Sequence, residues 1–188
     1  MFTRRALALL LAAQCLAPRS SVAAEPSAFD FVFEAIEGGP MPLAKWRGKV
    51  LLVVNTASFC GYTRQYQGLQ ALHERYGEAG LVVIGVPSND FGAQEPKGEK
   101  EILSFCQGAF NVTFPLTEKQ AVAGKTAHPF YGWARTVLGA GAAPRWNFHK
   151  YLVGRDGRLI AGYGSSVAPQ SATLVRAIEE ALTRPPGS

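Results

Sequence analysis

The strongest constraint on the fold of this chain is a pair of short apolar runs separated by a segment of helical pattern. The runs span 50–54 and 81–86, are rich in β-branched residues and are bounded by turn residues. Such runs are typical of strands that are buried on both faces of a sheet. Apolar residues recur between them at helical spacing, which predicts a helix over 63–79 that ends at Gly80. A strand, a helix and a second strand in this order predict a βαβ unit with parallel strands.

The rest of the chain predicts a mixed α/β domain around this unit. Two short apolar runs at 151–153 and 158–161 flank an Asp-Gly turn, which is a strong signal for a β-hairpin. We expect the other elements to be a strand at 29–33, a helix at 97–107, a short strand at 112–116 and helices at 128–138 and 169–182. This order predicts a thioredoxin-like fold, in which helices flank a mixed central sheet.

The first 24 residues have the pattern of a secretory signal peptide. Arg4 and Arg5 precede an apolar run at 6–13, and small residues precede Glu25. The run is shorter than the roughly 20 residues that span a bilayer. We therefore expect a signal peptide over 1–24, a single domain over 25–188 and export to the bacterial periplasm, with an uncleaved anchor and the twin-arginine route left open.

Charge and histidine placement exclude several function classes. The net charge falls from +5 to about +2 without Arg4, Arg5 and Arg19, and no basic run remains to indicate a nucleic-acid partner. The chain has three histidines at scattered positions, and none has metal-ligand spacing: His73, His128 and His149. We therefore expect no metal or bound cofactor.

Removal of the first 24 residues leaves two cysteines, Cys60 and Cys106. They could form a structural disulfide or a redox pair. Cys60 follows a buried strand and precedes a helix, where unpaired N–H groups favour the thiolate that attacks peroxide. Thr63 stands where a thioredoxin-type reductase has its second cysteine. A peroxidase needs no cysteine there, because its first product is a sulfenic acid.

Attack on a peroxide also requires neutral donors near the sulfur and the departing oxygen. Gln94 and the pair Trp146-Asn147 offer amide and indole N–H groups. Each also has an ordinary interpretation, as a solvated loop residue, a core residue or a turn residue.

Three motifs in order resemble the signatures of the glutathione peroxidase family. They are Asn-Thr-Ala-Ser-Phe-Cys-Gly-Tyr-Thr at 55–63, Val-Pro-Ser-Asn-Asp-Phe-Gly-Ala-Gln-Glu-Pro at 86–96 and Arg-Trp-Asn-Phe-His-Lys-Tyr-Leu-Val at 145–153. The similarity extends from about 29 to 182.

The resemblance implies the role of each site residue. It places the peroxidatic cysteine, in place of selenocysteine, at Cys60, and the donors at Gln94, Trp146 and Asn147. It also implies that Cys106 resolves the sulfenic acid as a disulfide, which a thioredoxin-like protein reduces in preference to glutathione.

The chain departs from the family pattern at a few positions. Ser88 replaces a frequent cysteine, which leaves Cys106 to resolve, and Asp90 replaces a glutamine and is expected to face solvent. The segment 139–144 lacks the extra loop of tetrameric members. Its shortness predicts a monomer whose open site admits organic or lipid hydroperoxides as well as hydrogen peroxide.

Two alternatives remain beside this interpretation. A peroxide-sensing relay protein would use the same first step and pass the oxidation from Cys60 to a partner. A peroxiredoxin has a proline and a threonine at set positions before its reactive cysteine. It is disfavoured here, because Thr56 lies four residues before Cys60, one too many, and no proline stands near it.

Overall fold

The computed structural model describes residues 26–185. The strands are β1 (Val32–Glu34), β2 (Pro40–Pro42), β3 (Val50–Thr56), β4 (Leu81–Pro87), β5 (Lys150–Val153) and β6 (Leu159–Tyr163). The α-helices are α1 (Gln65–Tyr76), α2 (Glu99–Phe110), α3 (Pro129–Leu138) and α4 (Ala172–Thr183), and short 3-10 helices lie at Ala28–Asp30, Leu43–Trp46 and Ala140–Ala142.

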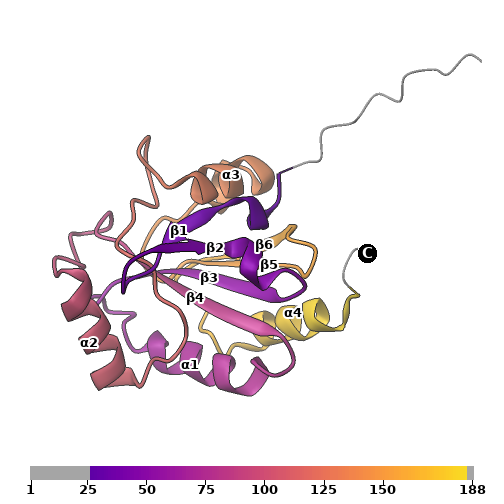
Figure 1. The fold of residues 1–188 in the computed structure, drawn as a ribbon, viewed down its shortest axis with the longest axis horizontal. Coiled ribbons are helices and arrows are strands. Elements are labelled where there is room, and N and C mark those ends of the chain that lie inside the picture. Colours follow the sequence, from indigo (N-terminus) through magenta and orange to yellow (C-terminus); the bar gives the residue numbers. More distant parts are fainter. Residues whose placement is uncertain (1–25, 186–188) are drawn as a thin grey trace, which may run out of the picture.

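The central sheet has four strands in the order β4-β3-β5-β6 (Figure 1). β3 pairs with β4 in parallel, from Val50 opposite Leu81 to Thr56 opposite Pro87. β3 pairs with β5 in the antiparallel sense, and β5 forms the predicted hairpin with β6. The predicted mixed sheet, βαβ unit and thioredoxin-like fold are therefore confirmed.

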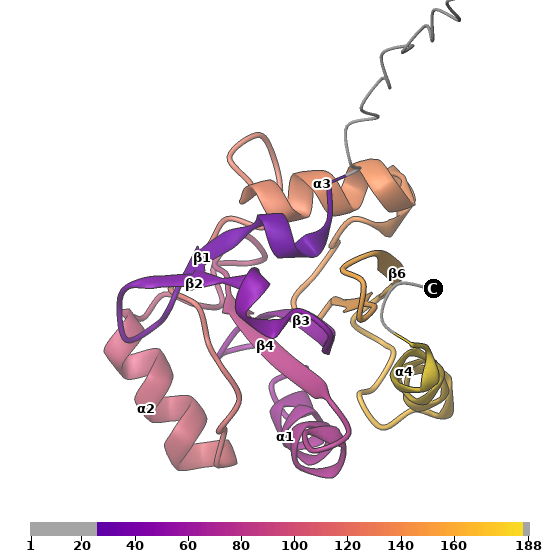
Figure 2. The ribbon, with the colours of Figure 1, turned by 45° about the vertical axis from the view of Figure 1, so that its right-hand side comes forward.

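The alternation of side chains along β3 divides the core into two layers. Leu52 and Val54 face α1 and α4, whereas Leu51 and Val53 face the β1–β2 ribbon and α3. Figures 1 and 2 show the ribbon and α3 on one side of the sheet, α1 and α4 on the other, and α2 at the edge beside β4. Because both faces are covered, all seven residues of β3 are buried, as its apolar run predicts.

Several predicted elements have different bounds in the structure. The first strand is divided, because Ala28–Asp30 forms a 3-10 helix before β1. The helix predicted over 63–79 spans Gln65–Tyr76. Turns closed by i→i+3 hydrogen bonds precede its start. Gly80, the predicted end of the helix, lies four residues beyond its last residue and has a φ of 106°.

The strand predicted at 112–116 is wrong. This segment pairs with the edge of β4 only around Gly85, whose N–H donates to Pro115 O and whose carbonyl accepts from Thr117 N–H, both at 2.9 Å. Pro115 has no N–H with which to continue a ladder, so the contact stays an isolated bridge.

The predicted signal peptide and its cleavage point lie outside the described residues. Within 26–185, no helix combines the length and the hydropathy needed to span a membrane.

Candidate active site

Cys60 lies in a tight turn after the carboxyl end of β3. The Thr63 hydroxyl accepts the Cys60 N–H at 3.0 Å, and the Cys60 carbonyl accepts the Thr63 N–H at 3.0 Å. The Tyr62 N–H points at the Cys60 Sγ from 3.4 Å. The expected helix N-terminus is therefore not adjacent, since α1 begins at Gln65, and an amide of the turn supplies the donor that stabilises a thiolate.

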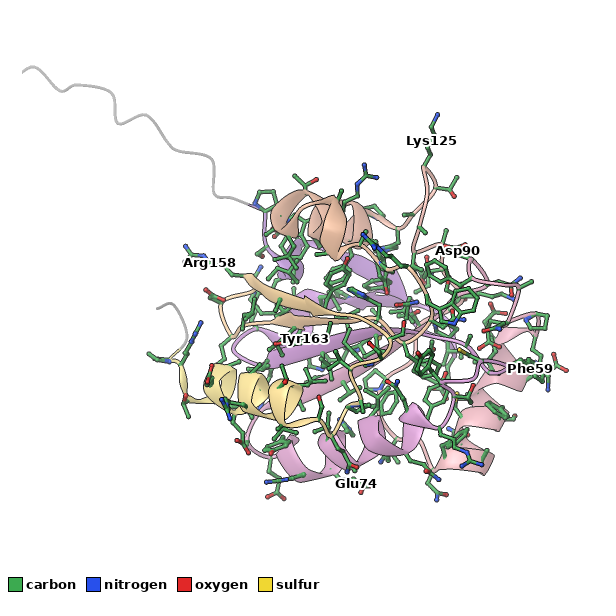
Figure 3. All side chains as sticks on the ribbon, turned by 180° about the vertical axis from the view of Figure 1, so that it is seen from behind. Phe59, Glu74, Asp90, Lys125, Arg158 and Tyr163 are labelled. Atoms are coloured by element: carbon green, nitrogen blue, oxygen red, sulfur yellow. The ribbon has the colours of Figure 1, made fainter. Side chains whose placement is uncertain are left out.

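The surface around Cys60 is aromatic. Cys60 is 8% exposed, whereas Phe59, Tyr62 and Trp146 are 55%, 38% and 39% exposed. Figure 3 shows Phe59 at one extremity of the molecule, with Arg158 at the other. The thiol therefore lies just below a surface on which apolar groups can be held.

Gln94 and Asn147 are paired beside this turn. The Asn147 Nδ2 donates to the Gln94 Oε1 at 3.0 Å, and Asn147 is fully buried. The Gln94 carbonyl accepts the Phe59 N–H at 3.0 Å, which ties the loop of Gln94 to the turn of Cys60. Because Gln94 receives a hydrogen bond on its oxygen, its Nε2 hydrogens remain available to a bound peroxide.

Trp146 packs on the same loop. Its ring lies 6.1 Å from that of Phe91, and a Cβ at Gly92 would stand 3.3 Å from it. The structure therefore brings all three predicted donors to the turn of Cys60.

Backbone strain is concentrated beside these donors. Within 26–185, three non-glycine residues have positive φ, and two of them adjoin Gln94 and Asn147: Ala93 at 52° and Phe148 at 63°. Such residues persist where surrounding contacts hold them, often at functional sites. The loops are thus fixed by their contacts rather than by local preference.

Two residues missed by the functional assignment hold these loops in place. The Asn55 Nδ2 donates to Trp146 O at 3.1 Å, and the Phe148 N–H donates to Asn55 O at 2.6 Å. The Glu95 Oε2 accepts the N–H and the hydroxyl of Ser58 at 2.8 and 3.0 Å. Asn55 and Glu95 both lie in the motifs given above. The role of Asn55 could have been inferred from its sequence position, since it is a polar residue at the end of a buried strand.

Glu95 is a buried carboxyl group. Burial raises its pKa above the ordinary value, and the hydrogen bonds from Ser58 act in the opposite direction. The hydrogen bonds from Ser58 to the Glu95 carboxylate link the turn of Cys60 to the loop that carries Gln94.

Cys106 lies on α2 and is fully buried. Cys60 and Cys106 are both free thiols, in the same cluster of buried side chains between the sheet and the helices. Burial raises the pKa of the Cys106 thiol to about 11. Cys106 therefore rests as a protonated thiol.

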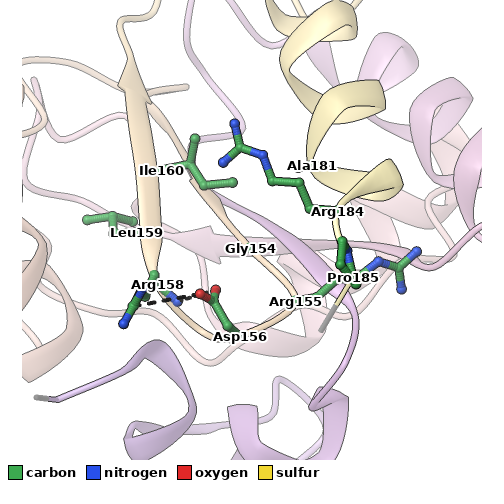
Figure 4. Close-up of a pocket in the computed structure, with 9 residues that line it drawn as sticks. All are labelled: Gly154, Arg155, Asp156, Arg158, Leu159, Ile160, Ala181, Arg184 and Pro185. Carbon is green, nitrogen blue, oxygen red and sulfur yellow. Dashed lines mark hydrogen bonds and ion pairs between the residues drawn. The ribbon is translucent and has the colours of Figure 1, made fainter. Parts of the chain in front are cut away.

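A hollow of about 360 Å³ adjoins the turn of Cys60, and its lining includes Gly61, Tyr62 and Pro169. A second cavity, of about 320 Å³, lies by the β5–β6 turn (Figure 4). Since Val153 pairs with Leu51, this second cavity is at the opposite end of β3 from Cys60. The guanidinium of Arg155 there is already bonded to the carbonyls of Gly48, Ala79 and Leu182.

Within residues 26–185, the remaining candidates make no hydrogen bond to Cys60 or to its three predicted donors. Among residues 26–185, no group of three or more His, Cys, Asp or Glu residues could hold a metal ion. Asp90 is exposed, as expected, and its carboxylate accepts the N–H groups of Val122 and Ala123 at 2.6 and 2.9 Å. Ser88 is fully buried.

His149 is buried, and its side chain is not fully hydrogen-bonded among residues 26–185. It is 6% exposed, and its Nε2 has no partner within the described residues. Burial, with the neighbouring Lys150 charge, lowers its pKa to about 4.

Known proteins share this architecture and these motifs. The family model "Glutathione peroxidase" matches residues 28–135. Hydroperoxy fatty acid reductase gpx1 of Synechocystis is 48% identical over 149 residues, which cover 75% of this chain and 88% of the relative. The glutathione peroxidase-like peroxiredoxin HYR1 of Saccharomyces cerevisiae is 42% identical over 150 residues, 78% of this chain and 90% of the relative.

A solved structure agrees with these relatives. The crystal structure of Trgpx in its apo form superposes with a TM-score of 0.71 at 34% identity, over 87% of this chain and 99% of that one. The chain therefore belongs to the glutathione peroxidase family, and with cysteine at its predicted reactive position it is a thiol peroxidase.

Proposed function

We propose that the Cys60 thiolate attacks the peroxide oxygen, releases water or an alcohol and becomes a sulfenic acid. Gln94 and Trp146 donate hydrogen bonds to the sulfur and to the departing oxygen, and Asn147, whose Nδ2 donates to Gln94 Oε1 at 3.0 Å and to Phe91 O at 3.4 Å, holds Gln94 in position. The observation that carries this proposal is the hydrogen bond from Phe59 N–H to Gln94 O, which fixes the donor loop against the turn of Cys60. Donors held in place before the reaction stabilise developing charge without reorganisation.

Cys106 then resolves the sulfenic acid. Its sulfur forms a bond to the Cys60 sulfur, the sulfur–oxygen bond breaks, and the hydroxide leaves with the Cys106 proton as water. An external dithiol of the thioredoxin type reduces the disulfide and needs no bound cofactor. The name of the yeast relative, a peroxiredoxin, supports a protein thiol as reductant.

The substrates include organic and lipid hydroperoxides. The exposed aromatic rings of Phe59, Tyr62 and Trp146 and the adjoining hollow can hold an acyl chain. The name of the Synechocystis relative, a hydroperoxy fatty acid reductase, supports this class. The short segment after α3, a 3-10 helix at Ala140–Ala142, supports a monomer, and the pattern of residues 1–24 supports export to the periplasm.

A thiol count after oxidation tests the two-cysteine cycle. The reduced chain, carrying Cys15→Ser, is treated with one equivalent of hydrogen peroxide and compared with Cys60→Ser and Cys106→Ser variants. We expect the loss of both thiols and of two hydrogen masses in the parent protein and a trapped sulfenic acid in Cys106→Ser. Cys60→Ser should retain its thiol.

The outcomes separate the parts of the proposal. A sulfenic acid that persists in the parent protein would remove Cys106 from the cycle. Slow turnover with thioredoxin and with glutathione alike would instead favour the relay that passes oxidation from Cys60 to a partner.

A further inference from the structure

The hydroxyl of Tyr66 is buried without a completed hydrogen bond. Tyr66 is the second residue of α1 and is fully buried, and its oxygen has no partner of regular geometry within residues 26–185. The Thr56 hydroxyl is in the same state. Buried polar groups are almost always bonded, because an unpaired group loses its hydration without compensation. An unpaired tyrosine hydroxyl where a phenylalanine would pack equally well requires an explanation.

The position of the ring is fixed by aromatic neighbours. The Tyr66 ring lies 5.4 Å from that of Phe110 on α2, 6.5 Å from that of Phe114, and 5.3 Å edge-on from that of Phe148. Phe148 follows the donor Asn147, and Phe110 is on the helix of Cys106. Tyr66 therefore stands between the peroxide site and the helix that carries the second thiol.

The hydroxyl lies against the Cys106 thiol and near the Thr56 hydroxyl. The charged group whose field reaches both Tyr66 and Cys106 is the Glu95 carboxylate, which opposes negative charge on each. Burial also opposes a thiolate at Cys106, and Tyr66 is the group that favours it.

Tyr66 can act only as a donor here. Burial raises its own pKa well above the ordinary value, so the hydroxyl keeps its proton. A neutral donor beside a thiol forms its strongest hydrogen bond when the thiol becomes a thiolate. The Tyr66 hydroxyl has only a loose contact with the resting Cys106 thiol, and it should complete its hydrogen bond when that thiol becomes a thiolate.

We propose that Tyr66 is a catalytic residue of the resolving step, whose hydroxyl donates a hydrogen bond to the Cys106 sulfur as that sulfur loses its proton. The inference rests on the proposed role of Cys106 and deepens it. The Cys106 proton leaves in the water formed from the Cys60 sulfenic acid, the new bond joins the two sulfurs, and Tyr66 keeps its proton. No further oxidant or reductant enters the step.

The test separates the two chemical steps by rapid quench. Full-length chains carrying Cys15→Ser are mixed with one equivalent of hydrogen peroxide and quenched at intervals. Intact mass then gives the sulfenic acid, one oxygen heavier, and the disulfide, two hydrogens lighter. In Tyr66→Phe we expect sulfenic acid formation within about twofold of the parent and disulfide formation about tenfold slower, the effect of one hydrogen bond to a charged group. The pH at which resolution is half-maximal should rise by about one unit.

Tyr131→Phe is the matched control. Tyr131 is also a buried tyrosine whose hydroxyl has no partner within the described residues, but it lies on α3, across the sheet from Cys106. Its loss should change neither step by more than about twofold.

A second measurement does not depend on the disulfide. In a Cys60→Ser background, the pH dependence of Cys106 alkylation by iodoacetamide should move upward on Tyr66→Phe and stay in place on Tyr131→Phe. Disulfide formation that is unchanged or faster in Tyr66→Phe, or an unmoved alkylation profile, would overturn the inference and leave the two-cysteine cycle intact. A parent protein that never forms the disulfide would overturn both.

Discussion

Thr63 shows how one residue separates this chemistry from that of a reductase on a similar fold. A cysteine here would make a Cys-x-x-Cys pair with Cys60. The threonine hydroxyl instead binds the Cys60 N–H at 3.0 Å and donates to a carbonyl of the same turn, the Cys60 O at 2.7 Å. Thr63 therefore holds the Cys60 backbone but supplies no thiol. The Cys60 sulfenic acid must be resolved by a thiol from another part of the chain or from a partner.

His149 predicts a loss of stability in acid. Its folded pKa of about 4 lies below the ordinary value of 6.5, so the unfolded chain binds the proton more readily. Stability should fall as the pH falls from about 6.5 through about 4. His149→Gln should flatten the free energy of unfolding over this window, measured by urea denaturation at several pH values.

His73→Gln is the comparison for this prediction. Burial also lowers the pKa of His73, but its side chain is only half-buried, so the expected change is smaller. An equal pH dependence in His149→Gln and the parent protein would contradict the assignment.

The sequence predicts which residues gather at the site better than how they are held. Resemblance placed Cys60, Gln94, Trp146 and Asn147, and the structure brings them to one end of β3. The hydrogen bond from Asn147 to Gln94 depends on loops with positive φ at Ala93 and Phe148, for which these residue types give no signal. The roles of Glu95 and Tyr66 emerge only when burial and unpaired atoms are known.

At the scale of elements, α2 is the most loosely attached helix around the site. Of its residues only Ile102 and Cys106 are buried, whereas α1 buries five. The N-cap residue of α2 is Gly98, which has no side chain to cap the helix, so the side-chain hydrogen bond there is the one that the Glu101 carboxylate accepts from the Gly98 N–H at 3.2 Å. A helix with few buried contacts opens at low cost in free energy.

We therefore predict that oxidation releases α2. We expect the Cys106 thiol to lose its proton at its buried position beside Tyr66, and α2 to loosen as the sulfur joins Cys60. Amide hydrogen exchange over 99–110 should be at least about tenfold faster in the peroxide-treated protein than in the reduced protein, while α1 and α4 change little. Equal exchange over α2 in both states would show that the disulfide forms without moving the helix.

Element prediction succeeded where the sequence carried a strong local pattern. The run at 50–54 and the Asp-Gly turn identified β3 and the β5–β6 hairpin, because apolar burial and turn chemistry are local properties. The segment 112–116 was mistaken for a strand, because its apolar residues pack against β4 and the helices while Pro115 interrupts the ladder.

At the scale of the whole molecule, the two ends of the sheet have different roles. The reactive turn follows the carboxyl end of β3, and the amino-terminal segment closes on the β5–β6 turn at the other end. There the Ala28 N–H donates to Gly157 O at 2.9 Å, and Gly157 has a φ of 84°. A Cβ at Gly157 would lie 2.6 Å from the Phe29 ring.

Gly157→Ala should therefore destabilise the fold without changing the chemistry. Positive φ and overpacking together predict a loss of about 3 kcal/mol in the free energy of unfolding, measured with urea. The rate of Cys60 oxidation should stay within about twofold of the parent in native conditions, because the turn is remote from it. Gly132→Ala, on α3 with open space around a new Cβ, is the matched control. Oxidation slowed in Gly157→Ala alone would contradict the separation of the two ends.

The measurement that tests the central claim most directly is the rate at which hydrogen peroxide oxidises Cys60 in the Cys106→Ser variant. Rapid mixing, alkylation of the remaining thiol and mass analysis of the peptide that contains Cys60 give this rate without the resolving step. Because one preorganised donor contributes about 10²–10³ in rate, oxidation should exceed that of free cysteine by more than about a hundredfold and should fall by about that factor in Gln94→Ala. A rate equal to that of free cysteine, unchanged by Gln94→Ala, would contradict a peroxidase site built around Cys60.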